Sequence, residues 1–354
     1  MQAEDPIIMR THAIIFRERG VIAHADVELP EPQPDHLVVE TLFTFVSSGT
    51  ETRVLQGHYG AEGNYPLIPG YACVGRVVQA GPKAAGYRLG DVISFSPCTD
   101  PASAPIGIRQ QWGGQCSHHL IHANTHPVVL PVGCDPLRFV ASQVAAISLR
   151  GVRMATPRPG EVAVVIGLGV IGASSAAWLK AAGCRVIGTD LAAARCRRAA
   201  AGWVDAAVCG SEPDAEARLL ALCAGVGADI VVEASGSVPG AQLAHRLVRC
   251  TPTAFYHPDN IDELRWPRLV YQANYLSPVP ITPSAWMPGE GAICITPRDR
   301  NLDDRRRSVH GIAAGTIDGR ALVDRVAPVS EAAQCYRDLL ERPDDLFSVA
   351  FSWT

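Results

Sequence analysis

Short apolar stretches separated by proline and glycine make up the first 150 or so residues of the chain. Residues 36–43 (HLVVETLF), 75–80 (GRVVQA) and 90–95 (GDVISF) each have the length of a single strand. The prolines and glycines between them are typical of turns and loops. This pattern predicts a mostly β domain whose loops are available for binding or catalysis.

The pattern changes after residues 156–160 (TPRPG), where apolar strands begin to alternate with alanine-rich helical stretches. Strands are predicted at residues 162–167, 185–190, 229–235 and 252–257. The helical stretches between them end at glycines, which suit the left-handed conformation that often closes a helix. Alternating strands and helices predict right-handed crossovers and a parallel sheet.

The end of the chain lacks this regular alternation. Residues 302–315 have a helical pattern, 321–329 an extended one, 330–342 a helical one capped by Ser330, and 347–353 an extended one. Periodicity alone leaves open whether this segment completes the first domain or extends the second.

Length and composition limit the kind of protein that these elements can form. A chain of 354 residues exceeds the size of one ordinary core, so two domains are expected. The net charge of -4 disfavours a nucleic-acid binder, and no apolar run reaches the roughly 18 residues that cross a bilayer. Eleven cysteines without a C-x2-C pair, and an N-terminus without a signal-like apolar segment, favour a cytoplasmic protein.

The strand at residues 162–167 leads directly into a glycine-rich turn and a helix. The glycines of a G-x-G-x-x-G pattern and the residues between them are Gly167, Leu168, Gly169, Val170, Ile171 and Gly172. The first glycine permits a tight turn, the second lets the backbone approach a pyrophosphate, and the third lets helix and strand pack closely. Because a helix N-terminus also favours phosphate charge, this segment predicts a dinucleotide site.

Charged residues after this motif bear on the choice of cofactor. Asp190 ends the next strand, where a carboxylate can accept both adenosine ribose hydroxyls and repel a 2′-phosphate, so NAD is favoured over NADP. Arg195 and two further arginines in the next helical stretch are the opposing signal, because they could hold a 2′-phosphate or simply form an exposed helix face. Ser235, at the carboxyl end of a later strand, is either a cofactor contact or an ordinary turn residue.

Five landmarks along the chain resemble those of the medium-chain dehydrogenase/reductase superfamily. They are SSGTE at 47–51, IPGYACVG at 68–75, GDVISF at 90–95, WGGQCSHHLI at 112–121 and GLGVIG at 167–172. The resemblance implies an α/β protein in which a GroES-like, mostly β catalytic domain accompanies a Rossmann domain with a doubly wound parallel sheet. The implied limits are residues 1–155 with 297–354 for the catalytic domain and 156–296 for the Rossmann domain.

Zinc-dependent members of this superfamily hold the metal with a cysteine, a His-Glu pair and often a further glutamate. The matching positions here are Ser47 or Ser48, then Tyr71 with Ala72, and Gln143. Hydroxyl, phenol and amide groups are poor zinc ligands at neutral pH. The chain therefore resembles the zinc-independent branch that contains bacteriochlorophyllide a dehydrogenase-like proteins, and we expect neither catalytic nor structural zinc.

An enzyme without the metal needs other groups to polarise the substrate oxygen and to handle one proton. Tyr71 is the first candidate, because its phenol stands at the vacated metal position. By the resemblance, Thr50 matches the hydroxyl that relays the substrate proton and Glu51 the acidic residue beside it, and Ser48 completes the set. Each side chain has a structural alternative, as an aromatic core residue for Tyr71 and as turn residues for the others.

The resemblance implies an NAD(H)-dependent oxidoreductase that interconverts a secondary alcohol and a ketone on a cyclitol, sugar or other specialised metabolite. Two alternatives stay open: NAD(P)H-dependent reduction of an activated C=C or C=N bond, and NAD(H) binding without turnover. The family also implies a homodimer or homotetramer with a small-molecule substrate and no nucleic-acid or membrane partner. The apolar, aromatic residues 264–286 predict an edge that pairs with a second chain, or a cap over the substrate.

Overall fold

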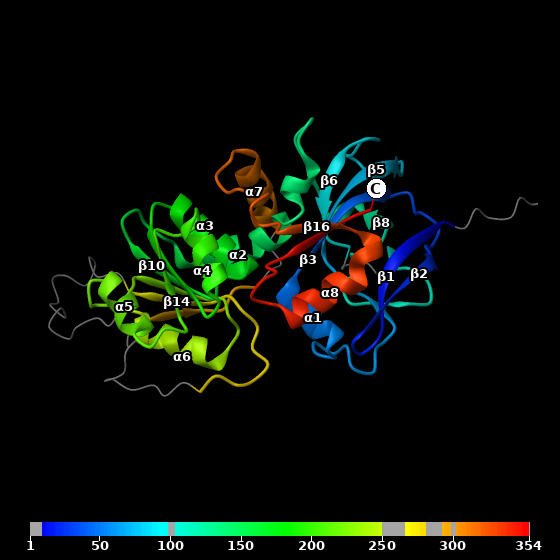
Figure 1. The fold of residues 1–354 in the computed structure, drawn as a ribbon. Helices are drawn as coiled ribbons and strands as arrows, with labels where there is room; N and C mark the ends of the chain where they lie inside the picture. Colours follow the sequence, from blue (N-terminus) through cyan, green and yellow to red (C-terminus); the bar gives the residue numbers. More distant parts are fainter. Residues whose placement is uncertain (1–8, 98–102, 250–265, 281–291, 299–301, 354) are drawn as a thin grey trace, which may run out of the picture. The chain divides into compact units, whose positions relative to one another are not determined.

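The computed structural model describes residues 9–97, 103–249, 266–280, 292–298 and 302–353 (Figure 1). The chain divides into two compact units, one formed by Met1–Gln143 with Arg305–Thr354 and the other by Val144–Asp304. The C-terminal segment, whose place periodicity left open, therefore lies in the first unit. The domain limits that the resemblance implies stay a proposal.

The first unit contains two sheets. The larger has the strand order β16-β17-β3-β5-β6-β9, with β8 paired to β3, and the smaller has the order β2-β1-β4-β7. The strands are β1 (Arg10–Glu18), β2 (Val21–Glu28), β3 (His36–Val46), β4 (Leu67–Ile68), β5 (Ala72–Ala80), β6 (Val92–Phe95), β7 (Arg109–Gln110), β8 (His118–His122), β9 (Val128–Val129), β16 (Arg325–Pro328) and β17 (Val349–Ser352). The three strands predicted near the N-terminus are present as β3, β5 and β6. Strand β3 is buried along most of its length because other strands flank it on both sides, which accounts for its long apolar run.

Helices α1 (Ser48–Leu55) and α8 (Ala332–Glu341) of this unit lie side by side, although they come from opposite ends of the chain (Figure 1). Short 3-10 helices cover η2 (Ala123–Thr125), η3 (Pro136–Phe139) and η6 (Val329–Glu331). The prediction that Ser330 caps α8 is wrong. The chain already turns into η6 after Pro328, so Ser330 lies inside this turn and Glu331 is the N-cap of α8.

The second unit is built on a six-stranded sheet of the order β12-β11-β10-β13-β14-β15, and every neighbouring pair in it is parallel. The strands are β10 (Val162–Ile166), β11 (Arg185–Asp190), β12 (Ala206–Cys209), β13 (Ile230–Glu233), β14 (Arg268–Tyr271) and β15 (Ile293–Ile295). Numbered within this unit, the order is 3-2-1-4-5-6, which defines the Rossmann fold and confirms the predicted doubly wound sheet.

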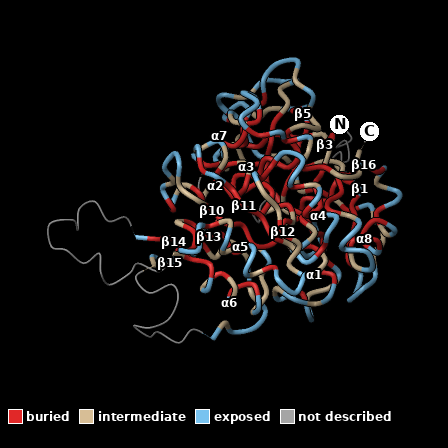
Figure 2. Tube along the Cα trace, turned by 60° about the vertical axis from the view of Figure 1, so that its left-hand side comes forward, coloured by how far each residue is buried: buried red, intermediate tan, exposed pale blue. Residues whose placement is uncertain are grey.

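Helices α2 (Ser142–Ala155), α3 (Val170–Ala181), α4 (Ala193–Ala200), α5 (Ala215–Leu222) and α6 (Val238–Leu247) accompany these strands, and α7 (Leu302–Ala313) spans the return to the first unit. Of the helices that the structure describes, none is long and apolar enough to cross a membrane. The strands β10 and β11 are buried on both faces, as in other parallel sheets, and Figure 2 shows this burial along the chain trace.

Two sequence predictions concern the last part of this unit. The strand predicted at 252–257 lies outside the described residues. Within the stretch 264–286, residues 268–271 form β14, which pairs with β13 on one side and β15 on the other. The apolar character of this part therefore comes from burial inside the sheet, and it is neither an edge nor a cap.

The tight turn between β10 and α3 leads to a stability prediction. A β-carbon at Gly172 would lie 1.7 Å from the carbonyl oxygen of Gly167, whereas a β-carbon at Gly169 would meet no atom within 4 Å. We expect Gly172→Ala to lower the free energy of unfolding by about 3 kcal/mol or more, because backbone must move to admit the methyl group. The matched variant Gly169→Ala should cost less than about 1 kcal/mol. Urea unfolding of the two proteins measures the difference, and equal stability would show that the turn can relax.

Candidate functional site

The loops that follow β10 and β13 meet at the carboxyl edge of the parallel sheet. Gly167 has a φ of +84°, and a β-carbon there would lie 2.7 Å from the backbone nitrogen of Ser235. These two strands are neighbours at the point where the strand order reverses, which is where open α/β sheets bind ligands. The structure thus places two predicted cofactor residues from separate loops in one location.

The N-terminus of α3 has the shape that a dinucleotide requires. Gly169 is its N-cap, no side chain caps it, and the space around the Gly169 α-carbon is open. The motif side chains face the protein: Leu168 is fully buried, and Val170 is 7% exposed. Ile171 is half-buried, and its carbonyl accepts a hydrogen bond from Ser148 Oγ at 3.0 Å. The residues present therefore fit a pyrophosphate at this turn.

Asp190 connects the glycine turn to the end of β11. Its Oδ2 atom accepts a hydrogen bond from the Leu168 amide at 2.7 Å, and its Oδ1 atom accepts one from the Ala192 amide at 2.9 Å. Arg195 Nη1 lies 3.5 Å from Asp190 Oδ2. The carboxylate that favours NAD and the arginine that could hold a 2′-phosphate therefore form an ion pair. Each carboxylate oxygen can accept more than one hydrogen bond, so Asp190 keeps capacity for ribose hydroxyls.

A buried glutamate, which sequence analysis missed, shapes the loop that carries Ser235. Glu233 is fully buried at the end of β13. Its carboxylate accepts hydrogen bonds from the Ser235 amide at 2.8 Å, the Gly236 amide at 3.2 Å, and the hydroxyls of Ser235 and Tyr275. The available signal was a charged residue at the end of an otherwise apolar strand. The amide and the hydroxyl of Ser235 both donate to the Glu233 carboxylate, so this one buried side chain holds Ser235 in place.

In the first unit, the loops at 68–71 and 111–115 pack backbone against backbone. The amide of Gly114 donates to the Gly70 carbonyl at 2.7 Å, and the amide of Gln115 donates to the Pro69 carbonyl at 3.0 Å. A β-carbon at Gly114 would lie 2.7 Å from the Gly70 carbonyl oxygen, so no larger residue fits without movement. This contact fixes the starting points of two side chains, those of Tyr71 and Gln115.

Tyr71 reaches the serine that precedes helix α1. Its Oη atom donates a hydrogen bond to Ser47 Oγ at 2.7 Å, and its ring packs edge-on against Trp112 with centroids 5.5 Å apart. Ser48 Oγ instead points to the Phe347 carbonyl oxygen, 3.4 Å away. The structure thus brings Tyr71 to Ser47 by a hydrogen bond between their hydroxyls.

Thr50 and Glu51 lie in the first turn of α1. The amides of both donate to the Ser47 carbonyl, at 2.9 and 2.8 Å, and Thr50 is half-buried. Glu51 is fully buried, and its carboxylate accepts hydrogen bonds from the Ser47 amide at 2.8 Å, Gln115 Nε2 at 3.1 Å and Tyr336 Oη at 2.6 Å. Burial raises the pKa of Glu51 to about 7, although the hydrogen bonds from these three residues act in the opposite direction.

Gln115 and Tyr336 are functional candidates that sequence analysis missed. Gln115 is fully buried and lies 64 residues from Glu51 in the chain, whereas Tyr336 is 285 residues away on α8. A polar residue after two glycines was a weak signal for Gln115. For Tyr336 the sequence offered only an aromatic residue in an amphipathic helix, a pattern that ordinarily indicates a core position.

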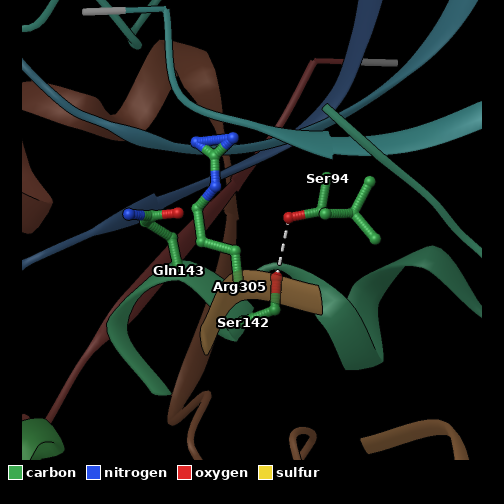
Figure 3. Close-up of a pocket in the computed structure, with 5 residues that line it drawn as sticks. Ser94, Ser142, Gln143 and Arg305 are labelled. Carbon is green, nitrogen blue, oxygen red and sulfur yellow. Dashed lines mark hydrogen bonds between the residues drawn. The ribbon is translucent and has the colours of Figure 1, made fainter. Parts of the chain in front are cut away.

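Gln143, expected at a metal-ligand position of the superfamily, lines a small pocket with Ser94, Val128, Ser142 and Arg305 (Figure 3). The hydroxyls of Ser94 and Ser142 are 2.8 Å apart. The Arg305 guanidinium in this pocket donates to the Thr125 carbonyl at 2.7 Å. A permanent positive charge beside the amide opposes a divalent cation there.

The donors at the other metal-ligand positions do not suit zinc either, because Ser47, Ser48 and Tyr71 offer hydroxyls and Ala72 offers no donor atom. Within the described ranges, no group of three or more His, Cys, Asp or Glu side chains could hold a metal ion. His118 and His122 share a half-buried face of β8 with His119 buried on the other, and His122 Nε2 lies 3.0 Å from Asp35 Oδ2.

Comparisons with known proteins extend these observations. No family model matches the chain. A sorbitol dehydrogenase of Halalkalibacterium halodurans is 28% identical over 255 residues, which is 67% of this chain and 74% of the relative. The 2-desacetyl-2-hydroxyethyl bacteriochlorophyllide A dehydrogenase of Cereibacter sphaeroides is 37% identical over 101 residues, 27% of this chain and 31% of the relative.

Solved structures match the fold over nearly the whole chain. An alcohol dehydrogenase of Escherichia coli CFT073, solved with NADH, aligns with a TM-score of 0.77 and 16% identity over 97% of this chain and 99% of that one. A protein described as a zinc-binding dehydrogenase of Sinorhizobium meliloti 1021, solved with NADP, aligns with the same TM-score and coverage and 21% identity. The strand order, the glycine turn and these alignments show a GroES-like and a Rossmann fold, and the chain is similar to medium-chain dehydrogenase/reductase proteins.

Proposed function

We propose that this protein is an NAD(H)-dependent oxidoreductase that interconverts a secondary alcohol and a ketone without zinc. The observation that carries the proposal is the hydrogen bond from Tyr71 Oη to Ser47 Oγ, formed where zinc-dependent members of the superfamily keep metal ligands. The sorbitol dehydrogenase among the relatives supports alcohol chemistry on a polyhydroxylated small molecule. A cyclitol, a sugar or another specialised metabolite is the substrate class that we propose.

The residues that would hold the cofactor are those of the second unit described above. The turn from Gly167 to Gly172 and the N-terminus of α3 would receive the pyrophosphate, Asp190 the adenosine ribose, and the Ser235 loop the part of the cofactor beyond the pyrophosphate. Bound NAD supplies a nicotinamide ring that accepts or releases a hydride. Because relatives of this fold are solved with either NADH or NADP, the preference for NAD rests on the Asp190 carboxylate.

The side chains of the first unit would then handle the proton. We propose that Tyr71 Oη donates its hydrogen bond to the substrate oxygen in place of Ser47 Oγ, and gives up its proton as a ketone is reduced. Thr50 is proposed to relay that proton to or from solvent, because its half-buried hydroxyl lies in the same turn. Glu51 and Ser48 would hold the turn, Glu51 through the Ser47 amide and Ser48 through the Phe347 carbonyl.

The two alternative functions make different demands on the same site. Reduction of an activated C=C or C=N bond needs less polarisation of an oxygen and commonly uses NADPH, which the Asp190 carboxylate disfavours. A binding protein without turnover would need no proton-transfer groups at all. We further propose a cytoplasmic homodimer or homotetramer, as the superfamily implies.

The first prediction concerns the cofactor. We expect the protein to bind NADH at least ten times more tightly than NADPH in fluorescence titrations, because Asp190 repels a 2′-phosphate. Asp190→Asn should lower this ratio about tenfold, which corresponds to about 1.4 kcal/mol. Asp205→Asn is the matched control, since Asp205 also accepts a backbone amide, that of Val186 at 2.7 Å, beside a basic side chain. Equal affinity of the wild-type protein for both cofactors would contradict the assignment of Asp190.

The second prediction concerns the phenol. Cyclitols or sugars should turn over with NAD, whereas α,β-unsaturated ketones should not be reduced at C=C with NADH or NADPH. Tyr71→Phe should lower kcat for the alcohol at least about 100-fold by removing the phenol that exchanges the proton. Tyr87→Phe removes a hydroxyl that donates to the Pro127 carbonyl at 3.0 Å in the same unit, and should leave kcat unchanged. Full activity of Tyr71→Phe, or stoichiometric zinc in the purified protein, would falsify this mechanism.

A further inference from the structure

The serine that accepts the Tyr71 hydrogen bond is the N-cap residue of helix α1. A serine at this position ordinarily accepts a hydrogen bond from an amide of the first turn. Ser47 makes no such side-chain cap, because its Oγ atom faces Tyr71 Oη. Glu51 instead reaches back to the Ser47 amide, as the glutamate of a capping box does, one residue later than usual. The carboxylate thus holds the backbone at the helix start, while the serine hydroxyl accepts the Tyr71 hydrogen bond.

The Glu51 carboxylate is buried among neutral hydrogen-bond donors. The ionisable groups on the surrounding elements are Arg53 of α1, Cys335, Tyr336, Arg337, Asp338 and Glu341 of α8, Arg325 of β16, Tyr71 of the loop 68–71, and Cys116, which follows the loop 111–115. Arg325 pairs with Glu331 and Asp338, and Arg53 donates to Tyr59 Oη. The hydrogen bonds that favour the ionised form of Glu51 come from Ser47, Gln115 and Tyr336, which are all neutral.

A chain of hydrogen bonds fixes the direction in which Gln115 points its amide. Trp353 Nε1 can only donate, and it donates to Thr44 Oγ1 at 2.9 Å. The Thr44 hydroxyl therefore donates onward to Gln115 Oε1 at 2.6 Å. This leaves Gln115 Nε2 to donate to Glu51 Oε2. Neither Gln115 Nε2 nor the Ser47 amide nitrogen can accept a hydrogen bond from a neutral Glu51.

Tyr336 is then the partner that decides the charge of Glu51. If Glu51 were protonated, it would have to donate to Tyr336 Oη, and the phenol proton would lose its acceptor. Tyr336 is fully buried, and its ring packs against the rings of Phe16 and Phe351 with centroids 5.2 and 5.9 Å away. These apolar surroundings offer the Tyr336 hydroxyl proton no other acceptor. The Tyr336 hydrogen bond therefore favours the carboxylate form of Glu51 over the neutral acid.

We infer that Tyr336 and Gln115 are positioning residues that keep Glu51 a buried carboxylate, and that this carboxylate holds the Ser47 backbone at the start of α1, from which the Ser47 hydroxyl reaches Tyr71. The inference rests on the proposed function for its catalytic consequence, although the titration of Glu51 can be measured without any substrate. Tyr336 comes from the C-terminal segment, so this segment contributes directly to the proton-handling site.

The test is the pH dependence of stability in four proteins: the wild type, Glu51→Gln, Tyr336→Phe and the double variant. The pKa of Glu51 lies above the value of about 4.3 that an unfolded chain has. The unfolded state therefore loses its proton first, and stability should fall as pH rises from about 4 to about 7 and then level off. Glu51→Gln should lack this fall, which isolates the contribution of Glu51 by difference.

Loss of the Tyr336 hydroxyl should move the upper end of this fall to higher pH. The hydrogen bond from Tyr336 favours the charged form of Glu51, so its loss should raise the pKa of Glu51 by about 1 unit. The comparison of Tyr336→Phe with the double variant measures that shift, and Tyr87→Phe should show none. The acid limb of kcat/KM should shift in the same direction, which a purely structural role of Tyr336 would not cause.

An unchanged pH range in Tyr336→Phe would overturn the inference, as would the same fall in Glu51→Gln as in the wild type. If Tyr336→Phe does not fold, Gln115→Met removes the other side-chain donor and should shift the range in the same direction. NADH binding by each variant separates the two proposals. An unshifted titration with intact NADH binding contradicts this inference alone, and a protein that binds no NADH contradicts the proposed function alone.

Discussion

The start of helix α1, from which Ser47 accepts the Tyr71 hydrogen bond, is held by a buried carboxylate. Glu51 accepts the Ser47 amide, and the Ser47 carbonyl accepts the amides of Thr50 and Glu51. The Ser47 backbone is therefore fixed on both sides, and its hydroxyl reaches Tyr71 from a defined position. Burying a carboxylate among neutral groups is costly, and Gln115 and Tyr336 offset part of that cost.

Both units fix the loops that carry proposed site residues, but they do so with different contacts. In the first, close backbone packing of Gly70 against Gly114 sets where Tyr71 and Gln115 begin. In the second, the glycine turn is closed by Asp190, which accepts the Leu168 amide, and the neighbouring loop is closed by Glu233. Glu51, Asp190 and Glu233 each lie at the end of a strand or the start of a helix. Each accepts a hydrogen bond from at least one backbone amide and thereby fixes a segment that carries proposed site residues.

Sequence reasoning succeeded where the determinants are local. The glycine turn could be predicted because Gly167, Gly169 and Gly172 lie within six residues, and a β-carbon at Gly167 or Gly172 would clash with nearby backbone. Gln115 and Tyr336 could not be predicted as partners of Glu51, because only the fold brings residues so far apart in the chain together. Ser330 was misinterpreted as a helix cap, and within the stretch 264–286, predicted as an edge or a cap, residues 268–271 lie inside the sheet as β14. A cap-like serine also suits a 3-10 turn, and an apolar stretch also suits a strand buried inside a sheet.

The central claim is that organic groups occupy the place of a metal around Tyr71. The most direct test is a crystal structure of the protein grown with NAD and zinc, with anomalous diffraction recorded on both sides of the zinc edge. The account predicts no anomalous peak near Tyr71, and an Oη atom within hydrogen-bond distance of Ser47 Oγ or of a bound alcohol. A zinc peak at about 2.0–2.3 Å from Tyr71 Oη, Ser47 Oγ or Ser48 Oγ would contradict it.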